Sequence, residues 1–224
     1  MIIKKSNQIV ASNINALIYG ESGTGKTTLA STLGDKTLIV SLESGLLSLK
    51  DHDIDYVEIE GKTGVEKITH FRQVLLEIAK SDYQNIFIDS LTEIAQAFVE
   101  LAKHEYPDDR QTMKMWGFYN ECITKLIKYT RDMNKNIFYT ALAKVDKDEA
   151  GRRFILPDMA GSIASKSPAF FDFVFHLMVF EKDGEKKRAL LTEKKNGCIC
   201  KVRSGKLDEY EVAHLGNIIN KVFN

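Results

Sequence analysis

Gly20-Glu21-Ser22-Gly23-Thr24-Gly25-Lys26-Thr27 is the stretch that decides the fold of this chain of 224 residues. It matches the full pattern Gly-x-x-x-x-Gly-Lys-Ser/Thr, in which glycines let backbone N–H groups turn toward phosphate oxygens. The apolar run at 16–19 predicts a strand before it, and residues 28–33 predict the opening of a helix after it. The alternative is a Gly-rich turn with a solvated lysine. The strand and helix on either side favour a nucleoside triphosphate site instead.

The parts of this stretch have distinct expected roles. The candidate phosphate-binding residues are Gly20, Glu21, Ser22, Gly23, Thr24, Gly25, Lys26, Thr27 and Thr28. Lys26 can reach the β- and γ-phosphates as a point charge, and the Thr27 hydroxyl can ligate Mg²⁺. The expected cofactors are therefore ATP and Mg²⁺. ATP is favoured over GTP because the sequence contains no Asn-Lys-x-Asp guanine motif.

Composition narrows the class of protein. Lys plus Arg and Asp plus Glu both number 31, so the formal net charge is zero and a uniformly basic nucleic-acid coat is excluded. The three cysteines, Cys122, Cys198 and Cys200, lack the spacing of a metal site and are expected to be unpaired thiols. The longest apolar stretch, at 170–180, is too short to span a bilayer. We expect a soluble cytoplasmic protein with no membrane partner.

Strand and helix patterns alternate along the chain, without repeats or linkers. They predict a single α/β domain over residues 1–224, with a doubly wound, mostly parallel sheet. Residues 170–180 and 188–192 flank a charged turn, which predicts an antiparallel C-terminal hairpin. Residues 143–166 are polar and are expected to form a long loop with a small hairpin near 149–151. A helix is expected at 212–223.

Two strand-end acids complete the candidate site. Asp89 ends the apolar run at 86–89, where it can hold a water of the Mg²⁺ shell, although such an aspartate often only caps the next helix. Glu43 ends the predicted strand at 38–43 and could activate the water that attacks the γ-phosphate; the alternative is a solvated acid. Strands are predicted between the Gly-rich loop and the run that ends in Asp89. They favour the architecture in which an extra strand of the sheet separates these two motifs. The candidate catalytic residues are Glu43 and Lys26, and the candidate metal ligands are Thr27 and Asp89.

These motifs together resemble the RecA-like P-loop NTPase core, in which a strand-end glutamate activates water and the metal-site aspartate is followed by serine, as in Asp89-Ser90. Four later segments are similar to phage-encoded AAA/RecA-like nucleotide-binding proteins, a group that includes single-strand-annealing recombinases: 115–120, 156–161, 171–175 and 201–208. The resemblance implies an ATPase in phage-type DNA recombination or annealing, located in the bacterial host cytoplasm. The other hypothesis is a nucleotide-gated loader or regulator of a replication partner with little turnover.

The sequence departs from the RecA-like pattern at two points. Leu142 stands where a polar γ-phosphate sensor is usual, so Thr140 or Lys144 would have to serve. Ser41-Leu42 precedes Glu43 where many relatives have an aspartate. Hydrolysis is therefore expected to be slow.

The resemblance also implies partners. The segments 104–114 and 144–166 correspond to loops that line a DNA channel. The second, from Lys144 to Lys166, has cations and one aromatic residue that could bind single-stranded DNA, and a charge-mixed solvated loop is the alternative. These residues are Lys144, Lys147, Arg152, Arg153, Phe154 and Lys166. Lys201 and Arg203 are candidate cations for a neighbouring subunit's γ-phosphate, which implies a homo-oligomer; the alternative is a solvated cationic strand.

Overall fold

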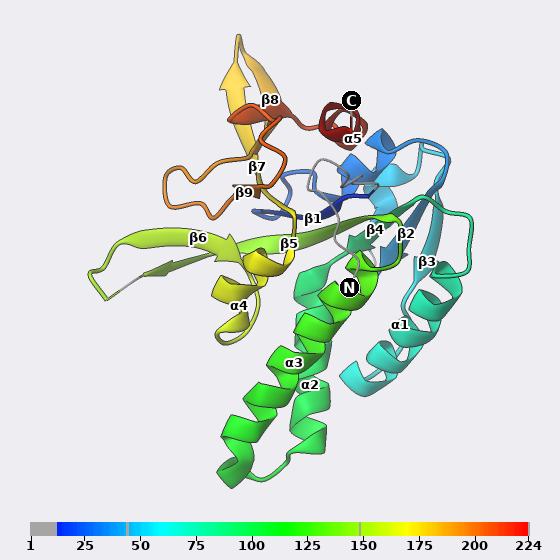
Figure 1. The fold of residues 1–224 in the computed structure, drawn as a ribbon, viewed down its shortest axis with the longest axis vertical. Coiled ribbons are helices and arrows are strands. Elements are labelled where there is room, and N and C mark those ends of the chain that lie inside the picture. Colours follow the sequence, from blue (N-terminus) through cyan, green and yellow to red (C-terminus); the bar gives the residue numbers. More distant parts are fainter. Residues whose placement is uncertain (1–12, 44, 148, 224) are drawn as a thin grey trace, which may run out of the picture.

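The computed structural model describes residues 13–43, 45–147 and 149–223, which form an α/β fold around one sheet (Figure 1). The main path of the sheet runs β10-β8-β7-β1-β5-β4-β2-β3, with β6 paired to β5 and β9 to β7. The strands are β1 (Asn15–Gly20), β2 (Thr37–Ser41), β3 (Asp55–Glu58), β4 (Asn85–Asp89), β5 (Asn136–Lys147), β6 (Arg153–Pro157), β7 (Phe173–Lys182), β8 (Glu185–Leu191), β9 (Lys201–Val202) and β10 (Tyr210–Val212).

Helices cover both faces of this sheet. The α-helices are α1 (Gly64–Ile78), α2 (Leu91–Glu105), α3 (Thr112–Arg131), α4 (Ile163–Lys166) and α5 (Leu215–Phe223). Four 3₁₀ helices are described as well: η2 (Thr27–Thr32), η3 (Leu46–Leu49), η4 (Asp109–Gln111) and η5 (Ser167–Phe170). Within the described residues, no helix is long and apolar enough to cross a membrane.

The central strands are apolar on both faces, as strands of a covered parallel sheet must be. In β1, Leu17 and Tyr19 belong to the core cluster under α1, α2 and α3. Ala16 and Ile18, on the alternate face, belong to the cluster under η2 and α5. The strand is thus fixed from both sides at the point where the Gly-rich loop leaves it.

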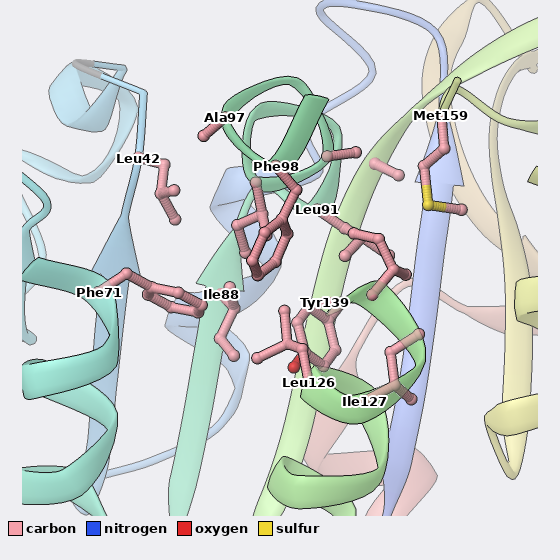
Figure 2. Close-up of a cluster of buried hydrophobic side chains, with 14 of the residues drawn as sticks. Leu42, Phe71, Ile88, Leu91, Ala97, Phe98, Leu126, Ile127, Tyr139 and Met159 are labelled. Atoms are coloured by element: carbon pink, nitrogen blue, oxygen red, sulfur yellow. The ribbon is translucent and has the colours of Figure 1, made fainter. Parts of the chain in front are cut away.

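The larger apolar cluster packs against β4 and β5. Figure 2 shows Phe71 of α1 and Leu126 of α3 packed around Ile88 of β4 and Tyr139 of β5. The buried Tyr139 hydroxyl forms a 2.8 Å hydrogen bond with Thr130 Oγ1. The ends of β4 and β5 are therefore positioned by a continuous apolar core.

The pairing confirms the predicted fold class. β1, β5, β4, β2, β3 and the first half of β7 pair in parallel. β8 turns back along β7, and β10 pairs with β8, both antiparallel, as the predicted C-terminal hairpin requires. The predicted extra strand is also present, because β5 pairs with β1 on one side and β4 on the other.

One local expectation was wrong and two were incomplete. The predicted helix after the Gly-rich loop is present, but as the six-residue 3₁₀ helix η2, in which Thr28, Ser31 and Thr32 donate their hydroxyls to backbone oxygens three residues earlier. The hairpin expected near 149–151 is present but longer than expected, because β5 and β6 pair over much of the segment 143–166 and α4 follows them. Val212 belongs to β10 rather than to the last helix, and 69% of it is exposed.

Candidate nucleotide-binding site

The loop at 20–27 wraps around the ammonium group of its own lysine. Lys26 is 9% exposed, and its Nζ donates to the carbonyl oxygens of Gly20 at 3.0 Å and Glu21 at 2.8 Å. Burial lowers the pKa of Lys26, while the charges of Asp89 and Glu43 act in the opposite direction. A phosphate group would supply the negative charge that this buried cation lacks.

Gly25 shows why the loop requires glycine. Its φ of 90° lies in the left-handed region, which side chains rarely adopt. A Cβ atom there would also come within 2.6 Å of the Arg188 guanidinium carbon. Any larger residue at 25 would strain the backbone and displace a neighbouring cation.

The structure brings the two candidate metal ligands together. Thr27 Oγ1 donates to Asp89 Oδ2 at 2.6 Å, although the residues are 62 positions apart in sequence. The buried Thr140 donates its hydroxyl to the other carboxylate oxygen, Oδ1. The helix-cap alternative for Asp89 does not apply, because Ser90 is the N-cap of α2 and accepts from Glu93 N at 3.4 Å.

Glu43 lies next to this pair. It follows β2, with an exposed side chain whose Oε1 accepts from Ser90 Oγ at 2.6 Å. Burial and, secondarily, the charge of Glu43 raise the pKa of the neighbouring Glu93. Asp89-Ser90 thus contacts both Thr27 and Glu43, so the predicted carboxylates share one edge of the sheet.

The candidate sensor residues separate in space. Thr140 donates its hydroxyl to Asp89, so it lies within the site. Lys144 is directed elsewhere: its Nζ donates to Met159 O and lies 3.7 Å from Asp158 Oδ1. Of the two alternatives to the apolar Leu142, the geometry favours Thr140.

Arg188 of β8 is a residue of this region that sequence reasoning missed. Its Nη1 donates to Thr28 Oγ1 at 3.3 Å, although the two residues are 160 positions apart. The first seventy residues of the sequence, which include the loop, contain no arginine. The only sequence feature that pointed to a cation here was the run of Lys and Arg at 186–188 in the predicted hairpin. That run does not reveal which of its side chains faces the loop.

Lys201 and Arg203 lie away from the loop and have partners within the chain. Lys201 Nζ donates to Ala169 O at 3.0 Å and Phe171 O at 2.7 Å. Arg203 Nη1 forms an ion pair with Asp172 Oδ1 at 2.5 Å. Asp172 N donates to the carbonyl oxygen of Asn15, the first residue of β1, at 3.0 Å. The loop at 20–27 begins at the other end of that strand. Lys201 thus has a structural role within the chain, whereas Arg203 is exposed beside its carboxylate partner, as a solvated cation would be. Action across a subunit interface stays a prediction.

The segment from Lys144 to Lys166 is only partly available to a partner. Phe154 packs partly against the main core, and Lys144 is paired with Asp158. The side chains of Lys147, Arg152 and Arg153 are exposed near the tip of the β5–β6 hairpin. DNA binding here stays a prediction, and the cations near the tip are its remaining basis.

A cluster of polar side chains, Tyr19, His176 and Cys198, lies beside β1. Tyr19 OH donates to Ile199 O at 3.0 Å, and its ring lies 5.0 Å from the His176 ring. His176 Nδ1 lies 3.6 Å from Cys198 Sγ, and burial lowers the pKa of the imidazole. All three cysteines are free thiols, as expected. Among the described residues, no group of three or more His, Cys, Asp or Glu could hold a metal ion.

Comparison with known proteins gives the family. The family model described as "AAA domain" matches residues 12–204. No curated protein matches the chain. Solved structures that match include a KaiC-like protein from the hyperthermophilic archaeon Pyrococcus horikoshii OT3, with 19% identity, a TM-score of 0.47 and coverage of 80% of this chain and 77% of that one. With the family model spanning most of its length and the P-loop geometry in place, this chain belongs to the AAA domain family of P-loop nucleotide-binding proteins.

Proposed function

We propose that this protein binds ATP with Mg²⁺ and hydrolyses it in the service of DNA recombination or single-strand annealing. One observation carries the proposal: Thr27 Oγ1 lies 2.6 Å from Asp89 Oδ2, which joins the P-loop to the end of β4. P-loop proteins use this hydroxyl and this carboxylate on the metal bound to the nucleotide phosphates. The family match supports the nucleotide, and the resemblance to phage annealing proteins supports the biological role.

The residues present fit ATP and Mg²⁺. Thr27 and Asp89 offer hard oxygen donors, which suit Mg²⁺, and this ion usually completes its shell with waters and substrate phosphates. Lys26 is buried, and within the described residues its hydrogen-bond partners are carbonyl oxygens, which it can exchange for phosphate oxygens. When bound, the metal would neutralise charge on the β- and γ-phosphates.

Glu43 is the proposed general base. Its carboxylate is exposed at the end of β2 and is oriented by the 2.6 Å hydrogen bond from Ser90. It can accept a proton from a water aligned on the γ-phosphate, while Lys26 stabilises the charge that develops there. The absence of an acid at Ser41-Leu42 favours slow turnover.

We also propose that the β5–β6 hairpin contacts single-stranded DNA through Arg152 and Arg153. Both are exposed near its tip: Arg153 pairs with Lys147 at the end of the β5–β6 ladder, and Arg152 precedes it. Homo-oligomerisation is proposed with Lys201 and Arg203 as cations acting in trans. To do so, Lys201 must leave two or more backbone oxygens and Arg203 must leave Asp172.

The rate of ATP hydrolysis with and without single-stranded DNA tests this function. Stimulation by DNA is the expected result. Turnover that is unchanged by DNA would contradict the recombination role and favour a nucleotide-gated loader or regulator. If the wild-type protein binds no Mg·ATP, the proposed function is contradicted.

A further inference from the structure

Two adjacent hydroxyls of the P-loop point to opposite flanks of β1. Thr27 donates to Asp89 on the side of β5 and β4. Thr28 accepts from Arg188 on the side of β7 and β8 and donates to Gly25 O at 2.7 Å. If the metal-bearing end of the phosphate chain lies toward Asp89, the opposite end must leave the loop toward Arg188.

A cavity lies where that end would emerge. It has a volume of about 540 Å³, within the size range of small-molecule sites, and it adjoins the P-loop at Gly23. The other lining residues are Val179, Lys186, Arg188, Val212 and Ala213. The two valines are 44% and 69% exposed, respectively, so they present apolar surface to a ligand rather than to the core.

The cavity wall is attached to the loop it faces. Register places Arg188 directly across from Val179 on β7, and β10 flanks β8 on its other side. After β10, the chain enters α5, whose Leu215 N donates to Thr32 Oγ1 of η2 at 2.8 Å. Figure 1 shows the β7–β8 hairpin projecting beyond the rest of the sheet with α5 beside it. The strand that carries Val212 of the cavity lining is therefore connected, through α5, to η2, the helix that follows the P-loop.

Charge distinguishes this cavity from a larger one on the opposite flank. The larger cavity, of about 910 Å³, is lined by Lys62, Lys67 and His70 together with four carboxylates: Glu43, Glu58, Glu60 and Glu66. The cavity at Arg188 is lined by two cations and, among described residues, no carboxylate. No acidic partner of the Arg188 guanidinium occurs within ion-pair distance in the described part of the chain, so the guanidinium can bind an anion.

We propose that the β7–β8 hairpin forms the nucleoside half of the site in cis. Arg188 contacts the α-phosphate beside Thr28, and the base and ribose lie in the cavity against Val179 and Val212. This inference rests on the proposed binding of ATP and adds the residues that hold the end of the nucleotide remote from the reaction.

Calorimetric titration of Mg·ATP into Arg188→Gln tests this role of the guanidinium. Removing one charge-assisted hydrogen bond is expected to weaken affinity roughly ten- to a hundredfold. Lys187→Gln is the matched control: it removes a neighbouring cation whose Nζ lies 3.6 Å from Glu185, and it should bind like wild type. Arg188→Lys should fall between the two. Equal affinities of Arg188→Gln and Lys187→Gln would overturn the assignment of Arg188.

Photolabelling with 8-azido-ATP tests the position of the base independently of any variant. Label on residues 179–188 or 210–213 is expected. Label on residues 58–70, which border the larger cavity, would overturn the nucleoside placement while leaving the proposed function intact. If the wild type binds Mg·ATP neither in calorimetry nor in labelling, the proposed function and this inference fail together.

Discussion

The two flanks of β1 are built differently. On the parallel flank, Asp89 at the end of β4 contacts Thr27 of the P-loop, and Thr140 of β5 donates to Asp89; the two residues are 5% and 0% exposed. On the antiparallel flank, β8 presents Arg188 from an exposed hairpin. The parallel flank therefore fixes its side chains through the core, whereas the antiparallel flank fixes them mainly through strand register. We expect changes on the first to alter chemistry and metal binding, and changes on the second to alter affinity alone.

The largest expected effect is that of Glu43→Gln on turnover. The amide keeps the shape of the side chain but cannot accept a proton, so the rate of hydrolysis should fall by about a hundredfold or more. Affinity for Mg·ATP should remain near that of wild type. Steady-state rates and calorimetric titration of the same protein separate the two quantities.

Glu58→Gln is the control for this variant, because Glu58 ends the adjacent strand, β3, and is also exposed. It should hydrolyse ATP at the wild-type rate. Parent-like turnover in Glu43→Gln would place the base elsewhere, and equal losses in both variants would point to a general effect of charge at this edge.

Asp89→Asn should change the dependence on Mg²⁺ instead. Asp89 accepts hydroxyl protons from Thr27 and Thr140 on its two oxygens, and an amide offers only one acceptor oxygen. The Mg²⁺ concentration for half-maximal activity should rise about ten- to a hundredfold. An unchanged Mg²⁺ requirement would show that Asp89 is not part of the metal shell.

Substitutions in the β5–β6 hairpin should weaken DNA binding without changing the affinity for nucleotide. Arg152→Ala/Arg153→Ala should weaken binding of single-stranded DNA, with a salt slope lower by roughly 0.7 for each phosphate that is no longer neutralised. Lys36→Ala/Lys80→Ala provides a control of equal charge change on exposed residues. If both double variants bind DNA equally, the hairpin is not the surface that binds DNA.

A smaller effect is expected on stability at acidic pH, from His176 of β7, the strand that pairs with β1. Burial lowers the pKa of His176 in the folded state, so the unfolded state binds more protons as pH falls below about 6.5. The free energy of unfolding should therefore decrease with falling pH in that window, and less so in His176→Gln. Urea unfolding at pH 7.5 and 5.5 measures this, with the exposed His52→Gln as control. Identical pH dependence in all three proteins would contradict it.

The parallel flank could be predicted from sequence because its signals are local. Lys26 and Thr27 belong to one motif, and Asp89 ends an apolar run whose direction follows from the parallel topology. The position of Arg188 at the loop could not be predicted, because a shift of one residue in hairpin register would direct Lys187 toward the loop instead. The prediction that Val212 belongs to the last helix was wrong for a related reason: an apolar residue at helical spacing can equally belong to a short edge strand.

The prediction for Lys201 and Arg203 rested on resemblance, and their partners depend on long-range contacts that sequence spacing does not show. Lys201 contacts the backbone around η5, about thirty positions earlier, and Arg203 pairs with Asp172. Mixing Lys201→Ala/Arg203→Ala with Lys26→Ala distinguishes the two roles. Partial recovery of ATPase activity is expected for action in trans, and no recovery despite co-assembly would leave only the structural role.

Titration of Mg·ATP into wild-type protein and Lys26→Ala tests the central claim, that the P-loop between the two flanks binds the nucleotide phosphates. The wild type should bind with a stoichiometry of about one nucleotide per chain, as expected for a single P-loop. Lys26→Ala should keep the wild-type circular dichroism spectrum and lose at least about thirtyfold in affinity, because its buried ammonium can no longer balance the phosphate charge. Equal affinity of the two proteins for Mg·ATP would contradict the account.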